Sequence, residues 1–145
     1  MNRKEKRIAR ISALQALYAW NLSGNDPGGT LAYISEWKED TLTPDIIKYA
    51  GKLSRITVKN IKICDDIIQD RSKNWEINRI TMIDKLILRL AIAELVFIED
   101  VPPKVSISEA VEIAKQFSTE DSSAFINGIL DSVYNDFQKG KLVIS

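Results

Sequence analysis

Histidine is absent from this chain of 145 residues, and cysteine occurs once, at Cys64. Without histidine the chain lacks the usual general base, every histidine-dependent catalytic triad and the commonest ligand of transition metals. A single cysteine forms no disulfide within the chain and cannot build a cysteine-based zinc site, which needs about four ligands. We therefore expect no metal, no cofactor and no enzymatic activity, and these absences favour a binding protein.

Long apolar runs are also missing. The most apolar stretch, residues 86–98, contains Arg89 and Glu94, so no segment reaches the roughly 18 uninterrupted apolar residues of a membrane span. The basic N-terminus is not followed by the apolar segment of a secretory signal. The six glycines form no phosphate-binding motif. We expect a soluble, cytoplasmic protein with no membrane partner.

The formal net charge is zero, with 20 basic and 20 acidic residues, but the charges are not spread evenly. The first ten residues contain five basic side chains against Glu5 alone, and the rest of the chain is mildly acidic. Short basic arms commonly contact nucleic-acid phosphates, although solvated charge is the more frequent explanation of such a cluster. The basic arm consists of Arg3, Lys4, Lys6, Arg7 and Arg10.

Apolar residues recur at helical spacing along most of the chain, which predicts an all-α protein of six or seven helices. Long helices are expected over residues 4–22, 44–71, 82–98, 106–117 and 123–139, with a short amphipathic piece near 31–37. The helix over 82–98 is apolar on nearly all sides, which is typical of a central, buried helix. We expect one domain over 1–145, with a loose division near residues 72–78 into sub-bundles 1–73 and 74–145.

Charged residues inside the predicted helices have simple structural explanations. Arg89 and Glu94 lie in the most apolar helix, and charges are rarely buried unless they are paired. They are five residues apart and face different directions, so each is expected to pair with another helix. The aspartates Asp65, Asp66 and Asp70 are interpreted as a solvated helix face, because a hard cation needs more ligands and a shaped loop.

Helix ends can be placed from capping patterns. Thr81 is followed three residues later by an aspartate, which is the spacing of a capping box. Ser106 and Glu109 show the same spacing. Asp121 or Ser122 is expected to cap the last helix. An interior glycine, Gly128, costs roughly 1 kcal/mol relative to alanine, so we expect it to permit a close helix contact.

Four segments, taken in order, resemble blocks of the transcription antitermination factor NusB family. They are RIARISALQALY at 7–18, DKLILRLAIAEL at 84–95, VPPKVSISEAVEIAK at 101–115, and residues 122–131, which contain FINGILD. The resemblance runs nearly from end to end and is weakest over residues 21–78. It implies two small helical bundles packed as one domain.

The resemblance also implies a function. Proteins of this family bind the boxA element of nascent ribosomal RNA together with the small-subunit ribosomal protein NusE. The implied partners are therefore boxA-type single-stranded RNA, NusE, and the RNA polymerase elongation complex with other Nus factors. A homodimer is left open by the sequence.

The family's contacts can be carried onto matching positions of this chain. The basic RNA-contacting segment falls on the basic arm, and Glu5 interrupts it, which is expected to reduce RNA affinity. Further RNA contacts fall on Asp121 and Phe125. The surface that faces NusE falls on Tyr18, Leu22 and Asp84.

Two alternatives stay open beside this interpretation. The first is the related RNA-binding domain of ribosomal RNA methyltransferases, although those chains continue into a Rossmann-like domain that 145 residues are not expected to hold. The second is a helical adaptor that binds only proteins and whose basic arm is incidental.

Overall fold

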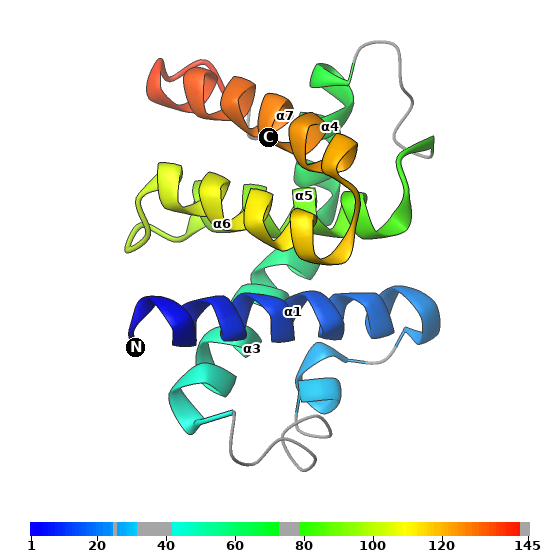
Figure 1. Cartoon of the computed structure of the whole chain (residues 1–145), viewed down its shortest axis with the longest axis vertical. Coiled ribbons are helices and arrows are strands. Elements are labelled where there is room, and N and C mark those ends of the chain that lie inside the picture. Colours follow the sequence, from blue (N-terminus) through cyan, green and yellow to red (C-terminus); the bar gives the residue numbers. More distant parts are fainter. Residues whose placement is uncertain (25, 32–41, 73–78, 143–145) are drawn as a thin grey trace. The chain divides into compact units, whose positions relative to one another are not determined.

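A computed structural model describes residues 1–24, 26–31, 42–72 and 79–142. The described residues form helices and no strand (Figure 1), which confirms the predicted all-α class. The chain divides into two compact units, Met1–Lys59 and Asn60–Ser145. Within the described residues, no helix is both long enough and apolar enough to cross a bilayer. The predicted piece at 31–37 lies almost wholly outside the described residues.

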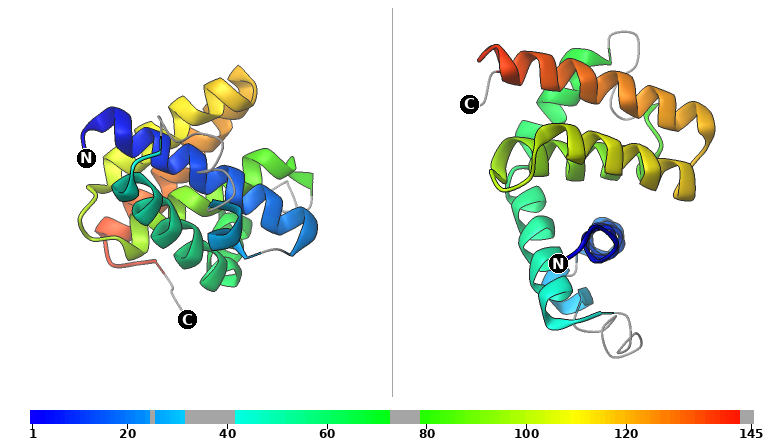
Figure 2. Two further views of the ribbon diagram at one scale, coloured as in Figure 1. Left: turned by 90° about the horizontal axis from the view of Figure 1, so that it is seen from below. Right: turned by 60° about the vertical axis from the view of Figure 1, so that its left-hand side comes forward.

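The first unit is built on α1 (Arg3–Ser23) and α3 (Pro44–Lys59), with a short helical segment at 27–31. The two long helices pack against each other, and the right-hand view of Figure 2 looks nearly along α1 with α3 beside it. Pro44 begins α3, and the Thr43 hydroxyl accepts a hydrogen bond from the Ile46 amide at 3.3 Å. This is the arrangement expected of a cap followed by proline at the first helical position.

The second unit is a bundle of α4 (Ile61–Arg71), α5 (Met82–Phe97), α6 (Pro103–Phe117) and α7 (Glu120–Gln138). The other three helices of the unit all contact α5. Residues 86–95 of α5 are buried without interruption. The prediction of a central helix is therefore confirmed for this unit.

An ion pair joins α4 to α5. The Arg89 guanidinium donates two hydrogen bonds to the Asp65 carboxylate, at 2.7 and 2.8 Å. Arg89 is 9% exposed, so the pair satisfies a charge that would otherwise be buried alone. The neighbouring Cys64 is also buried, and burial raises the pKa of its thiol to about 12, so the thiol stays protonated at neutral pH. The predicted pairing of Arg89 with another helix is confirmed.

The structure departs from the predicted elements in the middle of the chain. The helix predicted over 44–71 is broken at Asn60, between α3 and α4. Helix propensity is lower in the β-branched run at 56–58 and at Asn60, two residues after it, which favours a break there. The division between the two units falls at this break, earlier than residues 72–78, because α4 packs on α5 and α7.

Two local predictions in the second unit are wrong. Helix α6 begins at Pro103, so Ser106 and Glu109 lie inside it and form no capping box. Gly128 is exposed, and a Cβ atom built on it would have no neighbour within 4 Å, so no close helix contact explains this glycine.

We expect the Arg89–Asp65 pair to be a major stabilising contact of the second unit. Arg89→Ala leaves Asp65 without its partner in a partly buried place, which should lower the free energy of unfolding by about 3 kcal/mol. The control is Lys62→Ala. Lys62 pairs with Asp66 on the exposed side of α4, the helix that carries Asp65, and exposed pairs one turn apart contribute about 0.3–0.5 kcal/mol. Urea unfolding followed by circular dichroism measures both. Equal losses in the two variants would contradict the assignment.

Candidate nucleic-acid and partner interface

The basic arm is the first part of α1, and a capping box fixes where it begins. Asn2 is the N-cap, and its side-chain oxygen accepts a hydrogen bond from the Glu5 amide at 2.8 Å. The Glu5 carboxylate accepts in return from the Asn2 amide at 3.1 Å. This reciprocal pair satisfies free amides at the helix start. Glu5, which interrupts the basic run in the sequence, therefore completes the cap of the helix that carries the arm.

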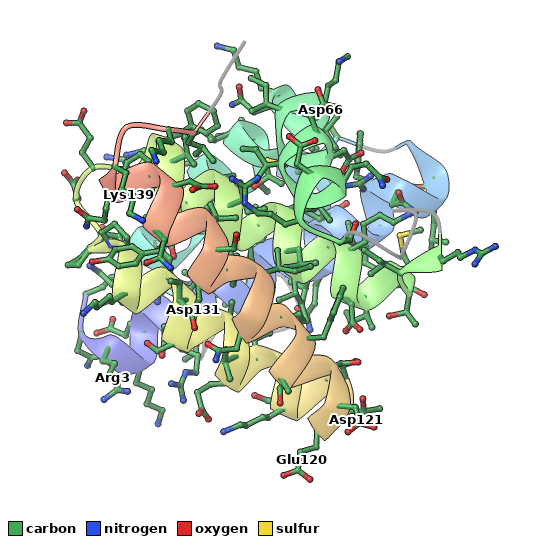
Figure 3. The ribbon with its side chains drawn as sticks, turned by 90° about the horizontal axis from the view of Figure 1, so that it is seen from above. Arg3, Asp66, Glu120, Asp121, Asp131 and Lys139 are labelled. Carbon is green, nitrogen blue, oxygen red and sulfur yellow. The ribbon has the colours of Figure 1, made fainter. Side chains whose placement is uncertain are left out.

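The five residues of the basic arm differ in exposure. Arg3 and Lys4 are exposed, Lys6 and Arg7 are half-buried, and Arg10 is only 3% exposed. Figure 3 marks Arg3 at the start of α1. The resemblance places RNA contacts on all five residues of the arm, and the burial of Arg10 corrects that expectation at this position.

The helical period explains why Arg10 is buried. Residues 13, 14 and 17 lie three, four and seven positions after Arg10, so all four residues lie on one face of α1. All four are buried. The part of the arm that solvent reaches is Arg3, Lys4, Lys6 and Arg7, and we call it the exposed basic turn.

An exposed apolar pair lies near the other end of α1. Tyr18 is 43% exposed and Leu22 is 69% exposed. They are one helical turn apart and so share a face. Gly24 ends the helix in the left-handed conformation, with φ of 75°, directly after its last turn. Large apolar side chains displayed together on one face are typical of a surface that binds another protein.

The second unit contains a small pocket where the start of α5 meets the start of α7. Its volume is about 250 Å³, and its lining includes Asp84, Asp121 and Phe125. The family resemblance places these three residues on two different surfaces, and the structure brings them to one place. Arg79, Ile80, Thr81 and Ser122 complete the lining.

Asp84 is built into the fold rather than displayed. It is 5% exposed, and its carboxylate accepts a hydrogen bond from the Ser118 hydroxyl at 2.8 Å. This bond links the first turn of α5 to the residue that ends α6. Thr81 caps α5 as predicted, by accepting a hydrogen bond from the Asp84 amide. The expectation that Asp84 belongs to an exposed partner surface is corrected accordingly.

Asp121, unlike Asp84, is exposed to solvent. The cap of α7 is Thr119, whose hydroxyl accepts a hydrogen bond from the Ser122 amide at 3.0 Å, so the prediction that Asp121 or Ser122 caps the helix is wrong. Asp121 is exposed in the first turn (Figure 3), and Phe125 lies half-buried one turn further along α7. An exposed carboxylate and a partly open aromatic ring thus border the same pocket.

Arg79 is a pocket residue that the sequence does not single out. It is exposed and lies two residues before the Thr81 cap, in a segment whose sequence predicts only a connection between two helices. It belongs to no motif and to no helical apolar pattern, so the sequence carries no specific signal for it. Its place in the same pocket as Asp121 follows from the packing of α7 against α5.

Comparison with known proteins identifies relatives along most of the chain. A model of the NusB family matches residues 7–135. A transcription antitermination protein NusB from Chloroherpeton thalassium is 42% identical over 139 residues, which cover 94% of this chain and 65% of that protein.

Two solved structures are similar in fold and sequence. The crystal structure of a plectonemic RNA supercoil contains a chain with a TM-score of 0.84 and 31% identity, and the match covers 94% of this chain and 98% of that one. The crystal structure of antitermination factors NusB and NusE in complex with double-stranded RNA gives a TM-score of 0.79 and 30% identity, covering 92% and 98%.

We expect the two aspartates of the pocket to respond differently to substitution. Asp84→Ala removes the acceptor of the Ser118 hydroxyl and should lower the free energy of unfolding by about 2 kcal/mol, since hydrogen bonds to charged groups contribute about 1.5–3 kcal/mol. Asp121→Ala is the matched control, because it changes an exposed residue of the same pocket and should shift stability by less than about 0.5 kcal/mol. Urea unfolding measures both variants. A loss in Asp121→Ala as large as that in Asp84→Ala would refute the division of roles.

Proposed function

The chain belongs to the NusB family, and from this membership we propose that it is a transcription antitermination factor that binds the boxA element of nascent ribosomal RNA together with the ribosomal protein NusE. It acts in the RNA polymerase elongation complex with other Nus factors. The observation that carries the proposal is the exposed basic turn, held in helical form by its capping box.

The exposed basic turn supplies the contacts to the RNA backbone. Basic side chains fix the register of a nucleic acid without reading its sequence. Each phosphate contact to a single strand contributes about −0.7 to the slope of log K against log[salt]. Four contacts from Arg3, Lys4, Lys6 and Arg7 would give a slope of about −2.8. Glu5 lowers the magnitude of this slope, because its charge opposes theirs.

The pocket between α5 and α7 suits an unpaired base. Proteins recognise single-stranded RNA by stacking bases on aromatic rings and by hydrogen bonds to base edges. Phe125 offers part of a ring, and Asp121 offers an acceptor for a base N–H group. Arg79 adds a guanidinium that can contact a phosphate or a base edge. We assign Arg79 to the RNA-binding residues with Asp121 and Phe125.

Tyr18 and Leu22 form the surface for the protein partner. An exposed apolar pair gains most when a partner covers it, because burial removes apolar area from water. A ribosomal protein bound there adds its own RNA contacts, so RNA that binds the factor weakly binds the complex more tightly.

A gel-shift assay tests the proposal directly. A single-stranded RNA that contains a boxA element should be shifted weakly by the factor alone and strongly when the ribosomal protein is added. A duplex of the same sequence serves as competitor. A shift in neither lane would exclude the proposed function and favour an adaptor that binds only proteins.

We expect the salt dependence to report the exposed basic turn. Replacing Arg3 and Lys4 together with alanine should reduce the magnitude of the salt slope by about 1.4, because two phosphate contacts are lost. The control replaces Lys48 and Lys52, two exposed lysines of α3, and should leave the slope unchanged. Fluorescence titration of labelled RNA at several salt concentrations measures the slope. The same loss in both variants would mean that only net charge matters.

Glu5→Gln separates the capping role of Glu5 from its charge. Glutamine can keep the capping hydrogen bond, so thermal stability should change little. Loss of one negative charge beside the basic residues should strengthen RNA binding about two- to fivefold at low salt. Glu5→Ala is the comparison, because it removes both the charge and the cap and should fray the start of α1. Weaker binding by Glu5→Gln would mean that the carboxylate itself contacts the RNA.

A further inference from the structure

A second concave surface lies on the second unit, between α6 and α7. It has a volume of about 620 Å³ and is lined by residues of these two helices alone. None of its lining residues belongs to the pocket between α5 and α7. We call this surface the α6–α7 groove. The groove stays open because the side chains along it include several short ones, among them Ser108, Ser123 and Ala124.

One face of α7 brings a row of polar side chains to this groove. Asn127, Asp131 and Asn135 follow at intervals of one helical turn, so they line up along the helix. All three are exposed. Figure 3 shows Asp131 between the Glu120 end and the Lys139 end of α7. The row therefore presents one carboxylate flanked by two amides.

Of the three charged side chains that line the groove, Asp131 is the one that can bind a ligand without losing another contact to a described residue. Glu112 pairs with Lys115 at 3.4 Å, and the Lys104 ammonium lies over the Tyr134 ring, 5.8 Å from its centre. Among the described residues, none forms a hydrogen bond or an ion pair with the Asp131 side chain. Its carboxylate can thus accept hydrogen bonds from a ligand without breaking a contact to any described residue.

The charge of the groove selects the class of ligand. Its charged residues are Lys104, Glu112 and Asp131, so the lining is net negative, and Glu120 adds acidic charge at the start of α7. A phosphate backbone is repelled by such a surface, whereas a cation is attracted. A guanidinium matches a carboxylate with two parallel hydrogen bonds, and amides can accept its remaining N–H groups.

We propose that the α6–α7 groove binds a basic helix of a protein partner, with an arginine placed on Asp131. A furrow between two packed helices accepts a third helix, whose anchor residues recur about one turn apart. The spacing of Asn127, Asp131 and Asn135 matches such a ligand. The site uses none of the residues proposed for RNA or for the ribosomal protein, so it is independent of that function.

The test titrates the ¹⁵N-labelled full chain with an alanine-based helical peptide of about 16 residues that carries arginines one turn apart. The side-chain amide signals of Asn127 and Asn135 should shift on binding. Asp131→Asn, which keeps the shape but removes the charge, should weaken binding about tenfold. Asp66→Asn is the matched control, because it removes an exposed carboxylate from α4 of the same unit (Figure 3), and it should bind the peptide as the unchanged protein does.

Several outcomes would overturn the proposal. Equal affinity of the peptide for Asp131→Asn and for the unchanged protein would show that the Asp131 charge does not contribute to peptide binding. Shifts confined to other helices, or no shift at millimolar peptide, would show that the groove does not bind a basic helix. If single-stranded RNA shifted the groove amides and displaced the peptide, the groove would belong to a nucleic-acid surface. Circular dichroism of both variants checks that the fold is unchanged.

Discussion

The burial of α5 is the constraint on which the second unit depends. A helix that is apolar on nearly all sides must be covered on nearly all sides, and α4, α6 and α7 provide that cover. The one basic side chain in its buried stretch, Arg89, is kept by the bidentate contact to Asp65. Once α5 is enclosed, the starts of α5 and α7 meet, and the pocket with Asp121 and Phe125 is formed.

The start of α1 shows how a charge that opposes the proposed RNA binding can serve the fold. Glu5 weakens the positive field of the exposed basic turn, yet it accepts the hydrogen bond that completes the capping box. A helical start holds Arg3 and Arg7 one turn apart, whereas an unstructured arm would lose conformational entropy on binding RNA. The local order therefore offsets part of the cost of the negative charge.

Residues that line the same concave surface can have different roles, as the pocket and the groove show. Asp84 and Asp121 border one pocket, but Asp84 is buried and bonded to Ser118, whereas Asp121 is exposed. In the groove, Glu112 and Lys104 are engaged within the protein, whereas Asp131 has no such contact within the described part of the chain. Hydrogen bonding and exposure, more than position, distinguish a residue that holds the fold from one that can meet a ligand.

Much of this protein follows from periodicity and motifs. The all-helical class, the central helix over 82–98, the paired state of Arg89 and the Thr81 cap depend on local spacing and on the cost of burying charge, so the order of residues alone determines them. The burial of Arg10, the internal bond of Asp84 and the position of Arg79 were decided by the tertiary structure. They depend on which helix faces meet, and contacts between residues far apart in the chain leave no periodic signal in it.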